Sequence, residues 1–492
     1  MKPTGLSIRT LIAAGAVGTL ALAVGIVYAQ APGGSGRGGG GRGGRGAGTP
    51  LAEAVDTNNN DAVTRDEMKK AFDAWYAAAD RKKSNAITQF ELQVALTPVF
   101  NRAKPEDISA MDAALPATPG AKPLKARKIL VFGNAAGFIH SSIPLAAKTV
   151  ADLGEKGNLW TTTVTYDPAD INAANLKQYD LIFLDSTTGC FLDDPKDPAA
   201  TAARRKAFMD FVNDGKGIAG IHAASDSYHT DCSKVGGMGG SANPVTVSTL
   251  ILKDGDTNGD QKLSRQEMDA LANTWFDKID TAKTGTVSRA DFAERFNAEV
   301  NPSTGGGFGG GFGRGFSGRG GGRGRGAAET GEKRVPLGQM PPGTVLDWPE
   351  FNKLIGGYFK FHWTYPQLIT VKIDDPNSPL TAMFHGKEFE IHDETYTFAQ
   401  DSYTRKNLHI LTSIDYDKMS EADKDKEPAA TGRTDGDYAL SYIHRQGKGR
   451  VFYEAHGHDE KIYAMTPMLE HVRAGIQYAL GDLKADDSPS QK

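Results

Sequence analysis

The chain has 492 residues and a net charge of −4 near neutral pH, from 56 Lys and Arg against 60 Asp and Glu. This near balance gives no support to a nucleic-acid partner or to binding at a charged membrane surface. The presence of only 2 cysteines excludes a small disulfide-stapled fold, and the length leaves room for several domains.

Residues 1–29 are typical of a secretory signal peptide. Lys2 and Arg9 precede an uncharged apolar run from Leu11 to Val27. Small residues, Val27 and Ala29, then stand at the −3 and −1 positions of a cleavage site after Ala29. We therefore expect a periplasmic or secreted protein with no integral membrane span in the mature chain. A retained N-terminal anchor is the alternative, because the apolar run is long for a signal peptide.

Two Gly- and Arg-rich segments, residues 30–49 and 301–343, interrupt the rest of the chain. Such a composition cannot bury enough apolar surface to offset the entropy of the chain, so we expect flexible linkers. Arg-Gly repeats also occur in RNA-binding proteins, but that role does not fit an exported protein. No nucleic-acid partner is therefore expected.

An internal repeat lies beside these linkers. DTNNNDAVTRDE (56–67) and DTNGDQKLSRQE (256–267) align residue for residue, and each is followed 24 positions later by a weaker copy, at 80–91 and 280–291. Amphipathic, helix-like segments flank every copy. The pattern predicts two small all-α modules, each a pair of EF-hands, at residues 50–100 and 233–300.

An EF-hand loop binds calcium through oxygens at its positions 1, 3, 5, 7, 9 and 12. The weaker copies lack a ligand, at Lys82 and Ala282, and the two stronger loops lack the usual Gly at position 6. We expect Ca²⁺ as a cofactor at the two stronger loops, in a structural or docking role rather than in signalling. The expected ligands are Asp56, Asn58, Asn60, the Ala62 carbonyl, Thr64 and Glu67 in one loop, and Asp256, Asn258, Asp260, the Lys262 carbonyl, Ser264 and Glu267 in the other.

Residues 125–232 and 344–484 read as one α/β domain that the insertion divides. Alternating strands and helices in the first part predict a mostly parallel sheet flanked by helices, and shorter strands follow in the second part. Whether Cys190 and Cys232 form a disulfide stays open. The expected strands cover 128–133, 161–166, 180–185, 217–222, 368–373, 409–413, 438–444 and 450–454, and the expected helices cover 141–153, with Ser141 or Ser142 as its cap, 199–212 and 467–480.

Several histidines follow expected strands directly. His140 comes after the first strand, His222 and Asp226 after the strand at 217–222, and His456 and His458 after the strand at 450–454. Because the carboxyl ends of parallel strands meet at one edge of a sheet, we expect these side chains to line one crevice.

The motifs at these positions resemble the trehalose-utilisation (ThuA-like) family. The resemblance implies a fold related to class I glutamine amidotransferases and a role in carbohydrate metabolism, such as the handling of keto-disaccharides. Where those enzymes carry a cysteine nucleophile this chain has His222, which excludes a cysteine-dependent amidotransferase. The motifs are KILVFGNAAGFIHSSIP (128–144), GIAGIHAASDSY (217–228), FNKLIGGYFKFH (351–362), FEIHDETYTF (389–398) and GKGRVFYEAHGHDEKIY (447–463).

Three chemistries stay open for the crevice. A second divalent metal could be held by histidines and a carboxylate, although no HExxH-type spacing is present. His222 could instead exchange protons with the help of Asp226 or Glu394. The crevice could also only bind a sugar, on Tyr358, Trp363 or Tyr396.

The leading hypothesis is a sugar hydrolase or isomerase that acts on a carbohydrate. The alternative is a non-catalytic, calcium-stabilised carbohydrate-binding or cell-surface interaction module, and a third hypothesis makes the EF-hands a calcium-dependent docking tag. The expected catalytic residues are His140, His222, Asp226, Glu394 and His458.

Overall fold

The computed structural model describes residues 47–194, 196–229, 243–301, 347–364, 367–400, 402–427 and 433–491. The expected signal peptide, nearly all of both expected linkers and Cys232 lie outside these ranges. Cys190 is disulfide-bonded. Helix α1 (Gly48–Val55) begins inside the segment that composition assigned to the first linker. Within the described ranges no helix has the length and apolar character needed to cross a membrane.

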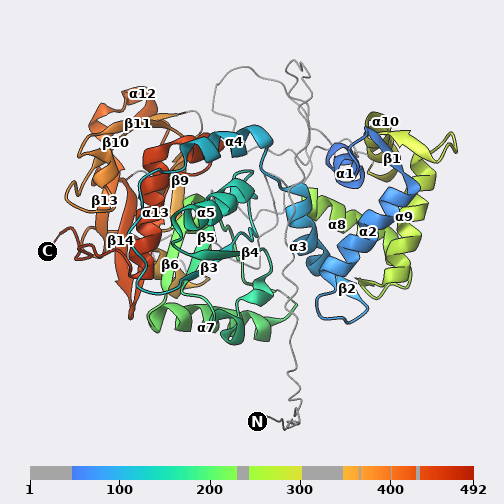
Figure 1. The fold of residues 1–492 in the computed structure, drawn as a ribbon, viewed down its shortest axis with the longest axis horizontal. Coiled ribbons are helices and arrows are strands. Elements are labelled where there is room, and N and C mark those ends of the chain that lie inside the picture. Colours follow the sequence, from blue (N-terminus) through green and yellow to red (C-terminus); the bar gives the residue numbers. More distant parts are fainter. Residues whose placement is uncertain are drawn as a thin grey trace, which may run out of the picture. The chain divides into compact units, whose positions relative to one another are not determined.

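A nine-stranded sheet, with the order β11-β10-β13-β14-β15-β6-β5-β3-β4, organises the α/β region (Figure 1). Neighbouring strands from β15 to β4 are parallel, as expected, whereas those from β15 back to β11 are antiparallel. The strands are β3 (Lys128–Phe132), β4 (Thr161–Thr165), β5 (Leu181–Asp185), β6 (Gly217–Ile221), β10 (Leu368–Ile373), β11 (Phe389–His392), β13 (His409–Ile414), β14 (Ala439–Gln446) and β15 (Gly449–Glu454).

Helices cover the parallel half of the sheet on both faces, which explains why every residue of β5 and β6 is buried. The chain passes from β3 to β4 through α5 (Ile143–Gly157) and, in the opposite direction, from β5 to β6 through α7 (Pro198–Asn213). Right-handed crossovers therefore place these two helices on opposite faces. The last helix, α13 (Thr466–Leu480), packs on β6 and β15.

Several short elements of the α/β region were not among the expected ones. Helix α11 (Pro349–Ile355) ends at Gly356, whose φ of +91° and tight approach to the Tyr442 ring leave no room for a side chain. Strands β9 (Phe359–Trp363) and β12 (Thr395–Phe398) pair in a separate two-stranded sheet. These elements are too short to produce a clear periodic pattern.

The N-terminal repeat pair and the inserted pair form one helical unit, where the sequence suggested two separate modules. Strand β1 (Ala62–Thr64) pairs with β8 (Thr286–Ser288), and β2 (Ile87–Thr88) pairs with β7 (Lys262–Leu263), so each strong loop adjoins a weak loop of the other segment. The two segments also share one buried core. Its helices are α1, α2 (Arg65–Ala79), α3 (Gln89–Phe100), α8 (Asn243–Gly255), α9 (Arg265–Ile279) and α10 (Arg289–Arg295).

Large aromatic side chains explain this interleaving. Phe72 on α2 lies against Trp275 on α9, with the ring centroids 5.7 Å apart, and both side chains are fully buried. Helices α2 and α9 cover one another's apolar faces, so the two segments bury these rings together.

Candidate metal centre

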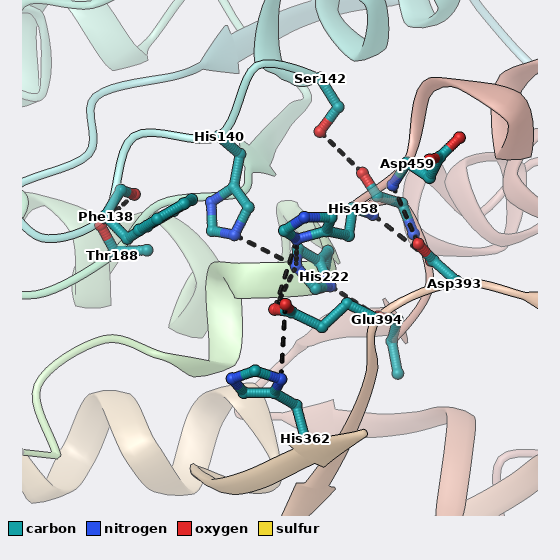
Figure 2. Close-up of polar contacts among 12 residues, drawn as sticks. Phe138, His140, Ser142, Thr188, His222, His362, Asp393, Glu394, His458 and Asp459 are labelled. Carbon is teal, nitrogen blue, oxygen red and sulfur yellow. Dashed lines mark hydrogen bonds and ion pairs between the residues drawn. The ribbon is translucent and has the colours of Figure 1, made fainter. Parts of the chain in front are cut away.

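Three parallel strands deliver one histidine each to the carboxyl edge of the sheet. His140 lies in the loop after β3, His222 directly follows β6, and His458 lies in the loop after β15. Since β15 and β6 are neighbours and end in register, their following residues emerge side by side. Glu394 reaches the same point from the connection between β11 and β12 (Figure 2).

These four residues, here called the His/Glu cluster, bring one ligand atom each to within 4.8 Å of one another. His222 Nε2 lies 3.3 Å from His140 Nε2 and 3.3 Å from His458 Nδ1. Glu394 Oε1 lies 3.3 Å from His458 Nδ1 and 3.9 Å from His222 Nε2. Four of the five expected catalytic residues therefore meet at one place, whereas His456, which was also expected at this edge of the sheet, bonds to Glu454.

His222 is oriented by the backbone around it. Its Nδ1 lies 3.0 Å from the carbonyl oxygen of Ala455, and because a carbonyl only accepts, Nδ1 carries the hydrogen. The lone pair of Nε2 therefore faces the cluster, an arrangement common among metal-binding histidines. The φ of His222 is +45°, which is costly for a residue with a side chain.

Burial and neighbouring charges set the protonation of the cluster. Burial, together with the adjacent imidazoles, lowers the pKa of His140 and of His222 well below the usual value, so both are neutral. Burial alone would also lower the pKa of His458, but the hydrogen bond and charge of Glu394 raise it. Neutral imidazoles beside a carboxylate are the form in which such side chains bind a divalent metal.

His362, on β9, lies on the other side of Glu394 and was not among the expected catalytic residues. Its Nδ1 is 3.4 Å from Glu394 Oε2, and its side chain is 32% exposed. Burial lowers its pKa, although the charge of Glu394 opposes that effect. The sequence signal for this residue was its place at the end of the motif FNKLIGGYFKFH.

Asp226, the fifth expected catalytic residue, does not join the cluster. Its Oδ1 accepts a hydrogen bond from Nε2 of His229, three residues along the same loop. The His229 ring in turn stacks on Tyr358, with the ring planes 4° apart. Asp226 therefore belongs to a neighbouring polar group and not to the set of converging ligand atoms.

The aromatic residues expected to bind a sugar are placed differently from one another. Tyr396 is buried with its ring centroid 4.3 Å from that of His222, whereas Trp363 is buried elsewhere and donates to the Asp423 carbonyl. Phe138, which was not expected, is 42% exposed, and its ring centroid lies 4.7 Å from that of His140. Phe138 is thus the exposed ring that borders the cluster.

The four repeated loops of the helical unit share one backbone shape. In each loop the residues at positions 4 and 6 have positive φ; they are Asn59 and Asp61, Lys83 and Asn85, Gly259 and Gln261, and Lys283 and Gly285. In both strong loops the acid at position 12 accepts hydrogen bonds from the backbone amide and the hydroxyl of the residue at position 9. The pairs are Thr64 with Glu67 and Ser264 with Glu267. These hydrogen bonds, led by the Ser264 amide, lower the pKa of Glu267 to about 2.

Comparison with known proteins gives one family match. The family described as "ThuA: Trehalose utilisation" matches residues 128–306 and 342–479, well over half of the chain. No curated protein matches. Among solved structures, a putative ThuA-like protein from Bacteroides uniformis is 16% identical, with 77% of this chain and 99% of that chain covered and a TM-score of 0.38. A putative ThuA-like protein from Parabacteroides merdae is 12% identical, with coverages of 75% and 96% and a TM-score of 0.35.

Proposed function

This chain belongs to the trehalose-utilisation (ThuA) family, and from that premise we propose that it acts on a carbohydrate at a divalent metal ion held by the His/Glu cluster. The family is associated with carbohydrate utilisation. The observation that carries the proposal is the convergence of three imidazole nitrogens and one carboxylate oxygen within 4.8 Å. Those atoms come from segments far apart in the chain, so chance proximity along the sequence does not explain them.

The donor set fits a first-row transition metal such as zinc. Imidazole and carboxylate together suit zinc, iron, copper and nickel, whereas calcium and magnesium prefer oxygen alone. A divalent ion at such a site polarises a carbonyl or lowers the pKa of a water molecule. Both effects serve the hydrolysis or isomerisation of a sugar or keto-sugar.

His362 is the residue we assign to proton transfer. It is partly exposed, its Nδ1 lies 3.4 Å from the outer oxygen of Glu394, and burial lowers its pKa so that it is neutral at pH 7. A neutral imidazole beside a metal centre can accept a proton from a substrate hydroxyl and return it later. With His222 as a ligand, this role moves from His222 to His362.

The test combines metal analysis with turnover. The mature protein is incubated with disaccharides and their keto derivatives, and products are followed by mass spectrometry beside the metal content of each sample. We expect about one transition-metal ion per chain and turnover in the wild type, and loss of both in His222→Ala. His409→Asn is the control, because His409 is also a buried histidine of the α/β region but bonds to Ser488 and Asp375 instead. Turnover that survives His222→Ala would contradict the proposal.

A non-catalytic carbohydrate-binding module is the second candidate, and the exposed ring of Phe138 beside the cluster favours it. Apolar ring faces of sugars stack on aromatic side chains, which needs no reaction. Saturable sugar binding without any product in the same assay would support this candidate over the enzyme.

We also propose that the loops 56–67 and 256–267 bind calcium as EF-hand loops. Support comes from the oxygen-bearing residues at the ligand positions and from the shared backbone shape of all four loops. Because each strong loop pairs with a loop of the other segment, calcium would fasten residues 48–100 to residues 243–300. A structural role fits the millimolar calcium outside cells, where weak sites are filled.

Export is part of the same proposal. The charged start, apolar run and small residue before the expected cleavage site support a signal peptide over residues 1–29. N-terminal sequencing of the protein recovered from the periplasm or medium should begin at Gln30. A chain that keeps its first 29 residues and stays with the membrane would favour the retained anchor.

A further inference from the structure

The loop that carries His458 is held by one buried carboxylate. Asp393 accepts hydrogen bonds from the backbone amides of Gly457 (2.7 Å), His458 (3.4 Å) and Asp459 (2.9 Å), as Figure 2 shows. Asp393 is fully buried, and it directly precedes the ligand Glu394. One acidic side chain therefore connects the segments of two cluster residues.

The carbonyl of Gly457 completes the connection on its other side. It accepts from Ser142 Oγ at 2.8 Å and from the Tyr463 hydroxyl at 3.1 Å. Ser142 stands two residues after His140, and its hydroxyl makes this bond where the sequence suggested a helix cap. The segments of His140, Glu394 and His458 are thus all tied to the backbone of one residue, Gly457.

Gly457 has no space for a side chain. Its φ is +128°, and an added Cβ would lie 2.9 Å from the Tyr463 hydroxyl oxygen and 3.0 Å from the side chain of Ile221. Only glycine adopts this backbone without strain. The tight fit fixes the direction of the Gly457 carbonyl and amide, and so the spacing of the segments bonded to them.

We propose that Asp393 is a positioning residue of the metal centre, which sets the separation of Glu394 from His458 through the backbone amides of residues 457–459. The inference rests on the proposed metal function of the His/Glu cluster. Metal sites need their ligands held within fractions of an ångström, and outer hydrogen bonds to the ligands' own segments supply that precision. The three amides also offset part of the cost of burying the Asp393 carboxylate.

Asp393→Asn tests the inference, because it keeps the size of the side chain but replaces one acceptor oxygen by an NH₂ group that repels backbone amides. The full mature chain is stripped with a chelator and titrated with Co²⁺, whose visible absorption reports ligand geometry. We expect Asp393→Asn to weaken Co²⁺ binding about 10- to 100-fold and to change the absorption spectrum of the bound ion.

Two further variants separate positioning from general stability. Ser142→Ala removes the bond to the Gly457 carbonyl and leaves Asp393 in place, so it should weaken Co²⁺ binding about 3- to 10-fold and keeps the test open if Asp393→Asn fails to fold. Glu427→Gln alters another buried carboxylate, bonded to Tyr438, and should lower the melting temperature with no change in Co²⁺ affinity or spectrum.

The outcomes distinguish the inference from the function on which it rests. Wild-type Co²⁺ affinity and spectrum in folded Asp393→Asn, or in Ser142→Ala where Asp393→Asn does not fold, would overturn the positioning role and leave the metal site intact. A wild-type protein that binds no Co²⁺, or binds it equally in His222→Ala, would overturn the metal function and the inference together.

Discussion

The His/Glu cluster and the repeated loops are the two proposed ion sites of this chain, and they are built in different ways. Each loop collects its ligand positions within twelve consecutive residues, whereas the cluster collects four ligands between residues 140 and 458. The expected ligands of the loops are oxygen atoms, of which the carboxylates of Asp56, Glu67 and Glu267 are buried, whereas the cluster offers three imidazoles and one carboxylate. The comparison predicts different metals: calcium for the loops and a transition metal for the cluster.

The two sites should also depend on the fold in different ways. The cluster exists only when the sheet is formed, because its residues follow separate strands and have no other means to meet. A loop can take its shape locally, but here its short strand pairs with a loop from a distant segment.

Glu394→Gln should produce the largest effect. The substitution removes the only carboxylate of the cluster and the charge that raises the pKa of His458. We expect turnover to fall by about 10²- to 10⁴-fold and the transition metal to be lost on dialysis, with calcium binding unchanged. Glu388→Gln is the control, because Glu388 is half exposed and pairs with Lys418 on the surface. If Glu394→Gln kept its transition metal and its turnover, the assignment of the cluster as a transition-metal site distinct from the calcium loops would be contradicted.

Acid should weaken the α/β region through a buried carboxylate, Glu454, at the end of β15. Burial alone would raise the pKa of Glu454, but hydrogen bonds from His456 and His471 lower it to about 2, from an ordinary value of 4.5. A carboxylate whose pKa is lower in the folded state than in the unfolded state stabilises the fold above its unfolded-state pKa. This contribution is therefore complete above about pH 4.5 and is lost as the pH falls toward 2. It amounts to about 3 kcal/mol.

The measurement is urea unfolding of the wild type and Glu454→Gln at pH 5 and at pH 3. The difference in the free energy of unfolding between the two proteins should shrink markedly at the lower pH. Glu388→Gln, with its exposed ion pair, should differ little from the wild type at either pH. An equal difference for Glu454→Gln at both pH values would mean that the carboxylate contributes by packing and not by its charge.

Calcium should stabilise the helical unit without affecting the cluster. At a free concentration of 100 times the dissociation constant, one site stabilises the folded form by about 2.7 kcal/mol. Glu67→Gln with Glu267→Gln removes the position-12 acid from both strong loops, so the rise in melting temperature on adding calcium should disappear. Isothermal titration of the same protein should show two sites lost. Unchanged calcium binding in the double variant would refute the EF-hand assignment.

Most of the sequence predictions that agree with the structure rest on local patterns and on buried apolar runs. The strand expected at residues 368–373 is β10, with the same bounds, and three of the four strand-end histidines converge; the fourth, His456, bonds to Glu454 instead. Asp226 was expected beside His222 only because the two residues lie close together in the sequence. Its carboxylate instead accepts a hydrogen bond from His229, further along the same loop. His362 could not be assigned to the site, because its contact with Glu394 depends on the pairing of β9 with β12. No local pattern specifies such a register.

The interleaving of the repeats is the second feature that the sequence did not specify. Four similar loops can pair within each segment or between the segments, and their sequences are compatible with both. The choice depends on the shared core, where rings such as Phe72 and Trp275 meet across α2 and α9. Contacts of this kind join residues about two hundred positions apart, beyond any periodic pattern.

The smallest predicted effect concerns the difference between the two strong loops. Arg289, at position 10 of the weak loop paired with loop 56–67, lies 3.4 Å from the expected ligand Asp56 and also bonds to Asp61. At the equivalent position beside loop 256–267 stands the neutral Gln89, bonded to Thr249. The guanidinium competes with a cation for Asp56, so loop 256–267 should fill with calcium first.

Exchanging these two residues tests that order. Arg289→Gln should strengthen calcium binding at loop 56–67 about 3- to 10-fold, since a partly exposed charge contributes about 1 kcal/mol at this range. Gln89→Arg should weaken loop 256–267 by a similar factor and leave the other loop unchanged. Each loop is titrated alone, in the background of Glu267→Gln or Glu67→Gln. If neither exchange moves either affinity, the order of filling is set by the number of carboxylates in each loop, and the paired weak loops act only as structural partners.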